Sequence, residues 1–138
     1  MSDDNSECKE LEKRLRDHGL RPTLQRMALG KILFGGNNKH VTAESLYSDA
    51  KAMDIDVSLA TVYNALHNFT SKGLLKEICI GPARSYFDTN IENHHHFYYE
   101  KSGQLEDIES ADVRLGQLPK VPSNLEILSV EVIIRIDG

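Results

Sequence analysis

Apolar residues recur at helical spacing along the first half of the chain. Four helices are predicted there, over residues 6–18, 24–33, 42–53 and 58–73. Hydroxyl side chains that can cap a helix N-terminus stand at three of the predicted starts: Thr23, Thr42 and Ser58. A tight turn separates the last two helices, which is typical of a helix-turn-helix arrangement.

The fourth predicted helix has two contrasting faces. One carries apolar side chains at spacing suited to a core: Leu59, Val62, Leu66 and Phe69. The other carries small, hydrogen-bonding and aromatic side chains: Ala60, Thr61, Tyr63, Asn64, His67 and Asn68. Such groups suit base edges in the major groove, whereas a merely solvated helix more often carries Glu and Lys. The pattern favours a recognition helix, with a plain amphipathic helix as the alternative.

Strand-like runs follow this helix. Residues 74–80 and 84–89 form a predicted hairpin across Gly81-Pro82-Ala83, with Cys79 expected in the core as an apolar strand residue. A hairpin directly after a recognition helix is a wing, and it places Lys76 and Arg84 for phosphate contact. Residues 1–89 are therefore predicted to form a winged-helix DNA-binding domain.

The remaining residues, 90–138, have a different character. A second hairpin is predicted over 96–100 and 104–108, and a last strand over 127–136. That strand alternates, with one apolar face made of Val130, Val132, Ile134 and Ile136. Three strands and a short helix bury little surface alone, so this small α/β domain is expected to dimerise with a second copy. The predicted fold class is α+β.

Composition narrows the cellular setting. The chain has 138 residues, 40% of them hydrophobic and 27% charged, as in ordinary globular proteins. It has no apolar run long enough for a membrane span, and its acidic start does not resemble a secretory signal. We therefore expect a cytoplasmic protein with no membrane partner. Two cysteines, Cys8 and Cys79, are too few for a cysteine-rich zinc site.

The net charge of −5 hides an asymmetry. Residues 9–76 carry 11 Lys and Arg against 7 Asp and Glu, whereas residues 77–138 carry 5 against 11. A basic first half suits nucleic acid, although so modest a bias is equally typical of a solvated face.

Three consecutive histidines, His94, His95 and His96, are the densest metal-capable feature of the chain. On a strand, His94 and His96 share one face and His95 points the other way. Paired imidazoles with carboxylates suit divalent iron, manganese or zinc, and paired imidazoles also suit haem iron. The alternative is an exposed polar strand end. Asp107 on the next strand could complete such a site, whereas His40 on its own reads as a loop histidine.

Catalytic signatures such as G-x-S-x-G, a P-loop or H-E-x-x-H do not occur in the sequence. Therefore the chain is not expected to be an enzyme. A metal-dependent enzyme using the His triplet is kept as the third hypothesis.

Three segments resemble signatures of the ferric uptake regulator family: residues 20–26 (LRPTLQR), 40–47 (HVTAESLY) and 57–63 (VSLATVY). The resemblance runs from about residue 11 to residue 107. It implies a dimer with a winged-helix domain for an operator, a dimerisation domain, and metal sites at their junction. The family's C-x-x-C motif is replaced by Tyr99 and Ser102, so its structural zinc is expected to be absent.

The resemblance also assigns residues to roles. It implies a regulatory metal site made of His40, Asp88, His94, His96 and Asp107. It implies that Tyr63 contacts bases beside Thr61 and Asn64, and that Arg21 enters the minor groove. With it, His67 is expected to lie beside the base contacts, and Arg26, Lys76 and Arg84 to anchor phosphate or sugar.

The His triplet followed by Phe97, without the cysteines, is similar to the iron response regulator (Irr) branch. That likeness implies haem binding at His94, His95 and His96 and release from DNA when haem accumulates. The leading prediction is thus an iron-responsive, homodimeric transcription regulator that binds A·T-rich inverted repeats and is released by haem. The alternative is a repressor activated by Mn²⁺, Fe²⁺ or Zn²⁺ at the five-residue site.

Overall fold

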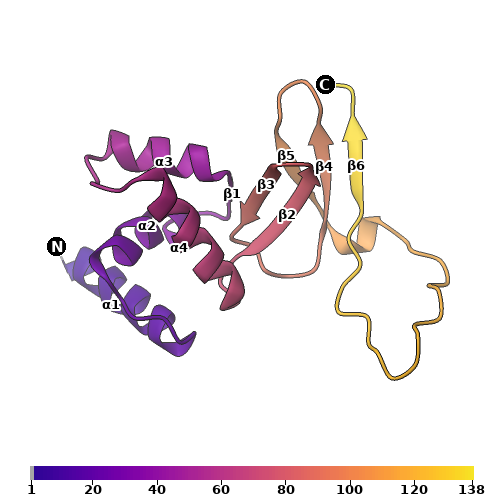
Figure 1. Cartoon of the computed structure of the whole chain (residues 1–138), viewed down its shortest axis with the longest axis horizontal. Coiled ribbons are helices and arrows are strands. Elements are labelled where there is room, and N and C mark those ends of the chain that lie inside the picture. Colours follow the sequence, from indigo (N-terminus) through magenta and orange to yellow (C-terminus); the bar gives the residue numbers. More distant parts are fainter. Residues whose placement is uncertain (1) are drawn as a thin grey trace. The chain divides into compact units, whose positions relative to one another are not determined.

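A computed structural model describes residues 2–138, with side chains from Asn5 onward. The chain divides into two compact units, one ending at Ile91 and the other running from Glu92 to Gly138. The boundary expected from the sequence, after residue 89, lies two residues earlier. Each unit is described by itself below (Figure 1).

The first unit begins with helices. They are α1 (Ser2–Asp17), α2 (Leu24–Phe34), α3 (Ala43–Ala52) and α4 (Leu59–Ser71). The three predicted caps are confirmed, because the side chains of Thr23, Thr42 and Ser58 each accept a hydrogen bond from a backbone N–H three residues on. None of the helices in the described residues is long and apolar enough to cross a membrane.

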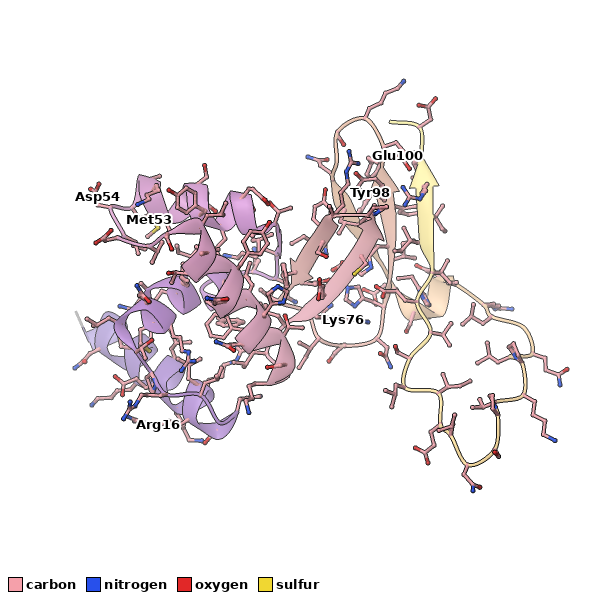
Figure 2. The ribbon with its side chains drawn as sticks, in the orientation of Figure 1. Arg16, Met53, Asp54, Lys76, Tyr98 and Glu100 are labelled. Atoms are coloured by element: carbon pink, nitrogen blue, oxygen red, sulfur yellow. The ribbon has the colours of Figure 1, made fainter. Side chains whose placement is uncertain are left out.

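A small antiparallel sheet completes this unit. Its strands are β1 (His40–Val41), β2 (Lys76–Gly81) and β3 (Arg84–Asp88), in the order β1-β3-β2. Figure 2 shows Lys76 at the start of β2. The sequence did not predict β1, because two residues are too few for a period-two pattern. From α2 to β3, the order helix, strand, two helices and a hairpin is that of a winged helix.

The core of the first unit corrects two expectations. Val62, Leu66 and Phe69 of α4 are fully buried as predicted, but Leu59 at its start is 36% exposed. The buried side chains of α4 begin one turn later, at Val62. Cys79 is exposed as well, because strand alternation turns its neighbours Ile78 and Ile80 inward and leaves the thiol outside.

The second unit is a mixed three-stranded sheet. Its strands are β4 (His95–Tyr99), β5 (Leu105–Ile108) and β6 (Ile133–Ile136), with a short 3₁₀ helix, η1 (Ser110–Asp112), after β5. β4 lies in the middle, antiparallel to β5 and parallel to β6. Tyr98 of β4 is buried in this sheet (Figure 2).

The last strand is shorter than predicted. Residues 127–132 belong to no strand, since β6 is limited by its register with β4. Many large apolar side chains of this unit remain exposed: Leu115, Leu118, Leu125, Ile127, Leu128, Val130 and Ile134. Of the apolar face expected on the last strand, Ile134 and Ile136 lie in β6, where Ile134 is exposed, whereas Val130 and Val132 lie before the strand.

Candidate metal centre and DNA-reading face

The first unit holds a histidine–carboxylate pair. The pairing of β1 with β3 sets His40 opposite Asp88, and His40 Nε2 lies 3.0 Å from Asp88 Oδ2. The other carboxylate oxygen, Oδ1, accepts a hydrogen bond from the backbone N–H of Asn90 at 2.9 Å. A buried carboxylate is thus oriented by backbone and faces an imidazole, so the pair can offer one nitrogen and one oxygen to a cation.

The second unit brings two imidazoles to one carboxylate. The β4–β5 register pairs His96 with Asp107, and the Nε2 atoms of His94 and His96 lie 3.1 and 3.2 Å from Asp107 Oδ1. The two rings are 4.4 Å apart between centroids. Alternation along the strand predicts this convergence, and it also sends His95 to the other face.

The contacts of the two Nδ1 atoms leave Nε2 of His94 and of His96 toward this cluster. His94 Nδ1 lies 2.6 Å from the carbonyl oxygen of Glu92, so its N–H donates there and leaves Nε2 as the nitrogen for a ligand. On His96, Nδ1 lies 3.3 Å from the Glu131 carboxylate, again with Nε2 toward Asp107. Sequence patterns carried no signal for Glu131, which lies outside every motif and in no strand.

His95 is held differently. Its Nδ1 accepts a hydrogen bond from the backbone N–H of Val132 at 2.9 Å, and the ring is buried. The triplet therefore divides into His94 and His96, which contact Asp107, and His95, which contacts the backbone of Val132.

The spacing in this cluster suits a metal ion. Ligand atoms at roughly 2.0–2.2 Å from one ion lie about 3.0–3.6 Å from each other, since the angles at the ion are near 90–110°. The two nitrogen–oxygen distances to Asp107 fall within that range. Imidazole together with carboxylate is the donor set of divalent iron, manganese and zinc sites.

The outward face of α4 carries the expected side chains. Ala60, Tyr63, Asn64, His67 and Asn68 are exposed, and Thr61 is partly covered. The Thr61 hydroxyl lies 2.9 Å from that of Ser58, so it is tied to the helix cap. A patch of small, aromatic and amide side chains without acid is thereby presented by one helix, as base-edge contacts require.

The Tyr63 side chain makes two contacts, one through its hydroxyl and one through its ring. Its hydroxyl donates a hydrogen bond of 2.8 Å to the Glu44 carboxylate, which lies in the first turn of α3. The ring also stacks on His67, with centroids 6.4 Å apart, and His67 in turn meets the ring of Phe87 edge-on. Glu44 was not identified from the sequence, because an acid near a helix N-terminus is ordinary there.

The predicted phosphate contacts fall into two groups. Arg21 and Arg84 are exposed, whereas Arg26 and Lys76 are partly covered. The Arg26 guanidinium donates a hydrogen bond of 3.0 Å to the carbonyl of Arg21 and so braces the turn that leads into α2. Arg26 therefore supports Arg21 as well as adding positive charge.

Comparison with known proteins identifies the family. The model of the ferric uptake regulator family matches residues 17–135. The chain belongs to the ferric uptake regulator family. The match includes both units, α4 and every histidine and carboxylate described above, and it confirms the resemblance seen in the sequence motifs. It does not distinguish the Irr branch, which stays a prediction.

Relatives and solved structures agree with this assignment. The chain is 38% identical over 93 residues to the peroxide-responsive repressor PerR of Staphylococcus epidermidis, covering 67% of the chain and 61% of that protein. The chain thus spans about three fifths of this curated relative's length. This relative is named as a repressor. The name agrees with the expectation that the chain is a regulator and not an enzyme.

Two solved structures share the fold. The ferric uptake regulator of Vibrio cholerae superposes with a TM-score of 0.73 at 20% identity, covering 92% of this chain and 98% of that one. That of Pseudomonas aeruginosa, solved with manganese, gives 0.70 at 23% identity, covering 92% and 96%. The α+β fold predicted from the sequence is therefore confirmed.

Proposed function

We propose that this protein is a transcription regulator that binds operator DNA as a dimer and responds to a divalent metal ion. The observation that carries the proposal is the convergence of two imidazole nitrogens on one oxygen of Asp107, at 3.1 and 3.2 Å. The Pseudomonas aeruginosa regulator was solved with manganese, which supports a metal of this kind. Mn²⁺, Fe²⁺ and Zn²⁺ all accept such donors.

The proposed regulatory site takes ligands from both units. His94, His96 and Asp107 would hold the ion from the second unit, and His40 with Asp88 from the first. An ion bound by both would favour the arrangement of the units that lets all its ligands reach it. Metal binding and DNA binding would then be coupled to the extent that DNA prefers the same arrangement.

DNA would be read by α4. Tyr63, Thr61, Asn64 and His67 would meet base edges in the major groove, and Arg21, Arg26, Lys76 and Arg84 would contact phosphate or sugar. The exposed apolar side chains of the second unit support dimerisation there, because exposed patches of this kind mark interaction sites. A two-fold dimer would read an inverted repeat, which we expect to be A·T-rich.

Release by haem is the second candidate. It is favoured by the His triplet and by Tyr99 and Ser102 standing where the family's cysteines would be. The Nδ1 atom of His95 already accepts a backbone hydrogen bond, and a haem bound through all three histidines would have to displace it. Binding through His94 and His96 alone requires no such change. The two candidates predict opposite effects of ligand on DNA binding.

Fluorescence anisotropy on a labelled, A·T-rich inverted repeat tests the proposal. Metal-stripped protein is expected to bind weakly, and added Mn²⁺ to strengthen binding at least tenfold. Asp107→Asn should abolish most of that gain, whereas His18→Ala, a histidine outside the cluster, should preserve it. Tight binding without metal that haem then removes would replace the proposal with the haem-released regulator.

A further inference from the structure

The hydrogen bond between Tyr63 and Glu44 joins the reading face of α4 to the start of α3. Tyr63 is 38% exposed, and Glu44 is exposed as well, so both groups are available to a ligand on this surface. Glu44 lies in the first turn of α3, between Thr42 and Ser45, whose side chains form a capping box. The helix N-terminus stabilises its negative charge, so the carboxylate is a steady acceptor.

The bond determines how the phenol can act. A tyrosine hydroxyl has one proton to donate and lone pairs that accept. Here the proton is directed to a carboxylate, and hydrogen bonds to charged acceptors are stronger than those between neutral groups. The bond to Glu44 raises the pKa of Tyr63 above its ordinary value, in keeping with a proton that is firmly held. The oxygen that faces outward is left with its lone pairs.

Because the Tyr63 hydroxyl donates its proton to Glu44, the phenol can bind only some of the base edges. In the major groove, adenine N6 and cytosine N4 are the donors, whereas thymine O4, guanine O6 and the N7 atoms of guanine and adenine are acceptors. Phosphate oxygens are acceptors too. A phenol whose proton is already committed cannot bind the acceptors by donation. Its oxygen can meet an amino group, and its ring can pack on a thymine methyl. The Tyr63 ring also stacks on His67, with an angle of 20° between the ring planes.

We infer that Glu44 is a specificity-determining residue: by holding the Tyr63 proton, it makes Tyr63 read amino groups of bases and not phosphates or base carbonyls. This inference rests on the proposed function. Glu44 also places a negative charge beside the reading helix, which weakens attraction to phosphate whatever the sequence. Glu44 thus lowers non-specific affinity and restricts the bases that Tyr63 accepts.

Two substitutions at Glu44 separate these effects. Glu44→Gln removes the charge but keeps a carbonyl that accepts the phenol proton, and Glu44→Ala removes both. The full chain, loaded with Mn²⁺, selects from a library of duplexes with randomised inverted repeats, and its affinity for a random-sequence duplex is measured alongside. Both variants should bind the random duplex more tightly. Only Glu44→Ala should lower the ratio of specific to random affinity, by about threefold to tenfold, and accept bases with carbonyl groups at the position facing Tyr63.

The Tyr63→Phe background supplies the control, because it has no hydroxyl proton to hold. There Glu44→Ala should still raise random-duplex affinity but leave the selected motif unchanged. The inference is overturned if Glu44→Ala selects the parent motif with an unchanged ratio, or changes the motif equally in the Tyr63→Phe background. If the parent protein enriches no sequence, the proposed function itself fails. Equal thermal melting of all variants verifies that each one is folded.

Discussion

The two units differ in how completely each covers its own apolar side chains. In the first, leucines from α1 to α4 and the rings of Phe69 and Phe87 form one buried cluster, with Leu15, Leu29 and Leu46 at zero exposure. In the second, Tyr98 and Ile108 are the buried apolar side chains among the described residues, while most large aliphatic residues after η1 are exposed. The first unit buries most of its large apolar side chains, and the second leaves most of those after η1 exposed.

This difference between the units shows what helical periodicity and strand alternation in a sequence can each establish. Helical periodicity with caps determines a fold when the apolar stripes meet within the same unit, as α2, α3 and α4 do here. Strand alternation identifies an apolar face but not what covers it. In the proposed dimer, the first unit would read DNA with a core of its own, and the second would complete its core with the partner copy.

A substitution at the centre of the first unit should have the largest effect. Phe69 is fully buried and packs edge-on against Phe34, with centroids 5.8 Å apart. We expect Phe69→Ala to lower the free energy of unfolding by about 3–5 kcal/mol, measured by urea unfolding followed through the helical circular dichroism. Leu24→Ala is the control, because Leu24 is 90% exposed; its effect should stay within about 0.5 kcal/mol. Similar losses for both would mean that this core is not packed as described.

Much of the first unit could be predicted from the sequence, and the errors have physical causes. The caps at Thr23, Thr42 and Ser58 follow from local hydrogen bonding, which depends on few residues. Leu59 reads as a core residue, but it is the first residue of its helix and is 36% exposed. Periodicity gives the direction of a side chain and not the extent of the surface it faces.

The exposed face of the second unit should give the next largest effect. Ile134 of β6 is 40% exposed and lies on the apolar face predicted to dimerise. Ile134→Glu should weaken the dimer by roughly 1.5–3 kcal/mol, or about tenfold to a hundredfold in dissociation constant. Sedimentation equilibrium measures this, with Gln117→Glu, an exposed polar position, as the matched control. A dimer that tolerates Ile134→Glu would place the interface elsewhere in the chain.

The candidate site was predictable only in part. Alternation alone pairs His94 with His96 and separates His95, whereas Asp107 joins them through a strand register that no local pattern specifies. His40 and Asp88 came from the family resemblance, since the two-residue strand β1 that pairs them leaves no signature. Glu44 and Glu131 were missed because contacts between distant side chains depend on tertiary packing.

The smallest predicted effect concerns the contacts that the Nδ1 atoms of His94 and His96 make on the side of each ring away from Asp107. His94 Nδ1 contacts a backbone carbonyl, which no substitution removes, whereas His96 Nδ1 lies 3.3 Å from the Glu131 side chain. Glu131→Gln should therefore weaken Mn²⁺ binding about tenfold, which is the lower end of the loss in metal affinity when a residue that contacts a metal ligand is replaced. Glu126→Gln, which changes an exposed acid of the preceding loop, should leave Mn²⁺ binding unchanged. Isothermal titration calorimetry on the metal-stripped dimer measures both.

Glu131 immediately precedes the segment that pairs with β4, where the His96 N–H donates to the carbonyl of Val132 at 3.1 Å. Glu131, which contacts the proposed metal ligand His96, therefore lies close in sequence to the exposed apolar side chains of Val130 and Ile134. If dimerisation holds that segment in place, Ile134→Glu should also reduce Mn²⁺ affinity, and adding Glu131→Gln should then reduce it little further. Fully additive losses would show instead that the segment is fixed within one chain and that metal binding is independent of the dimer.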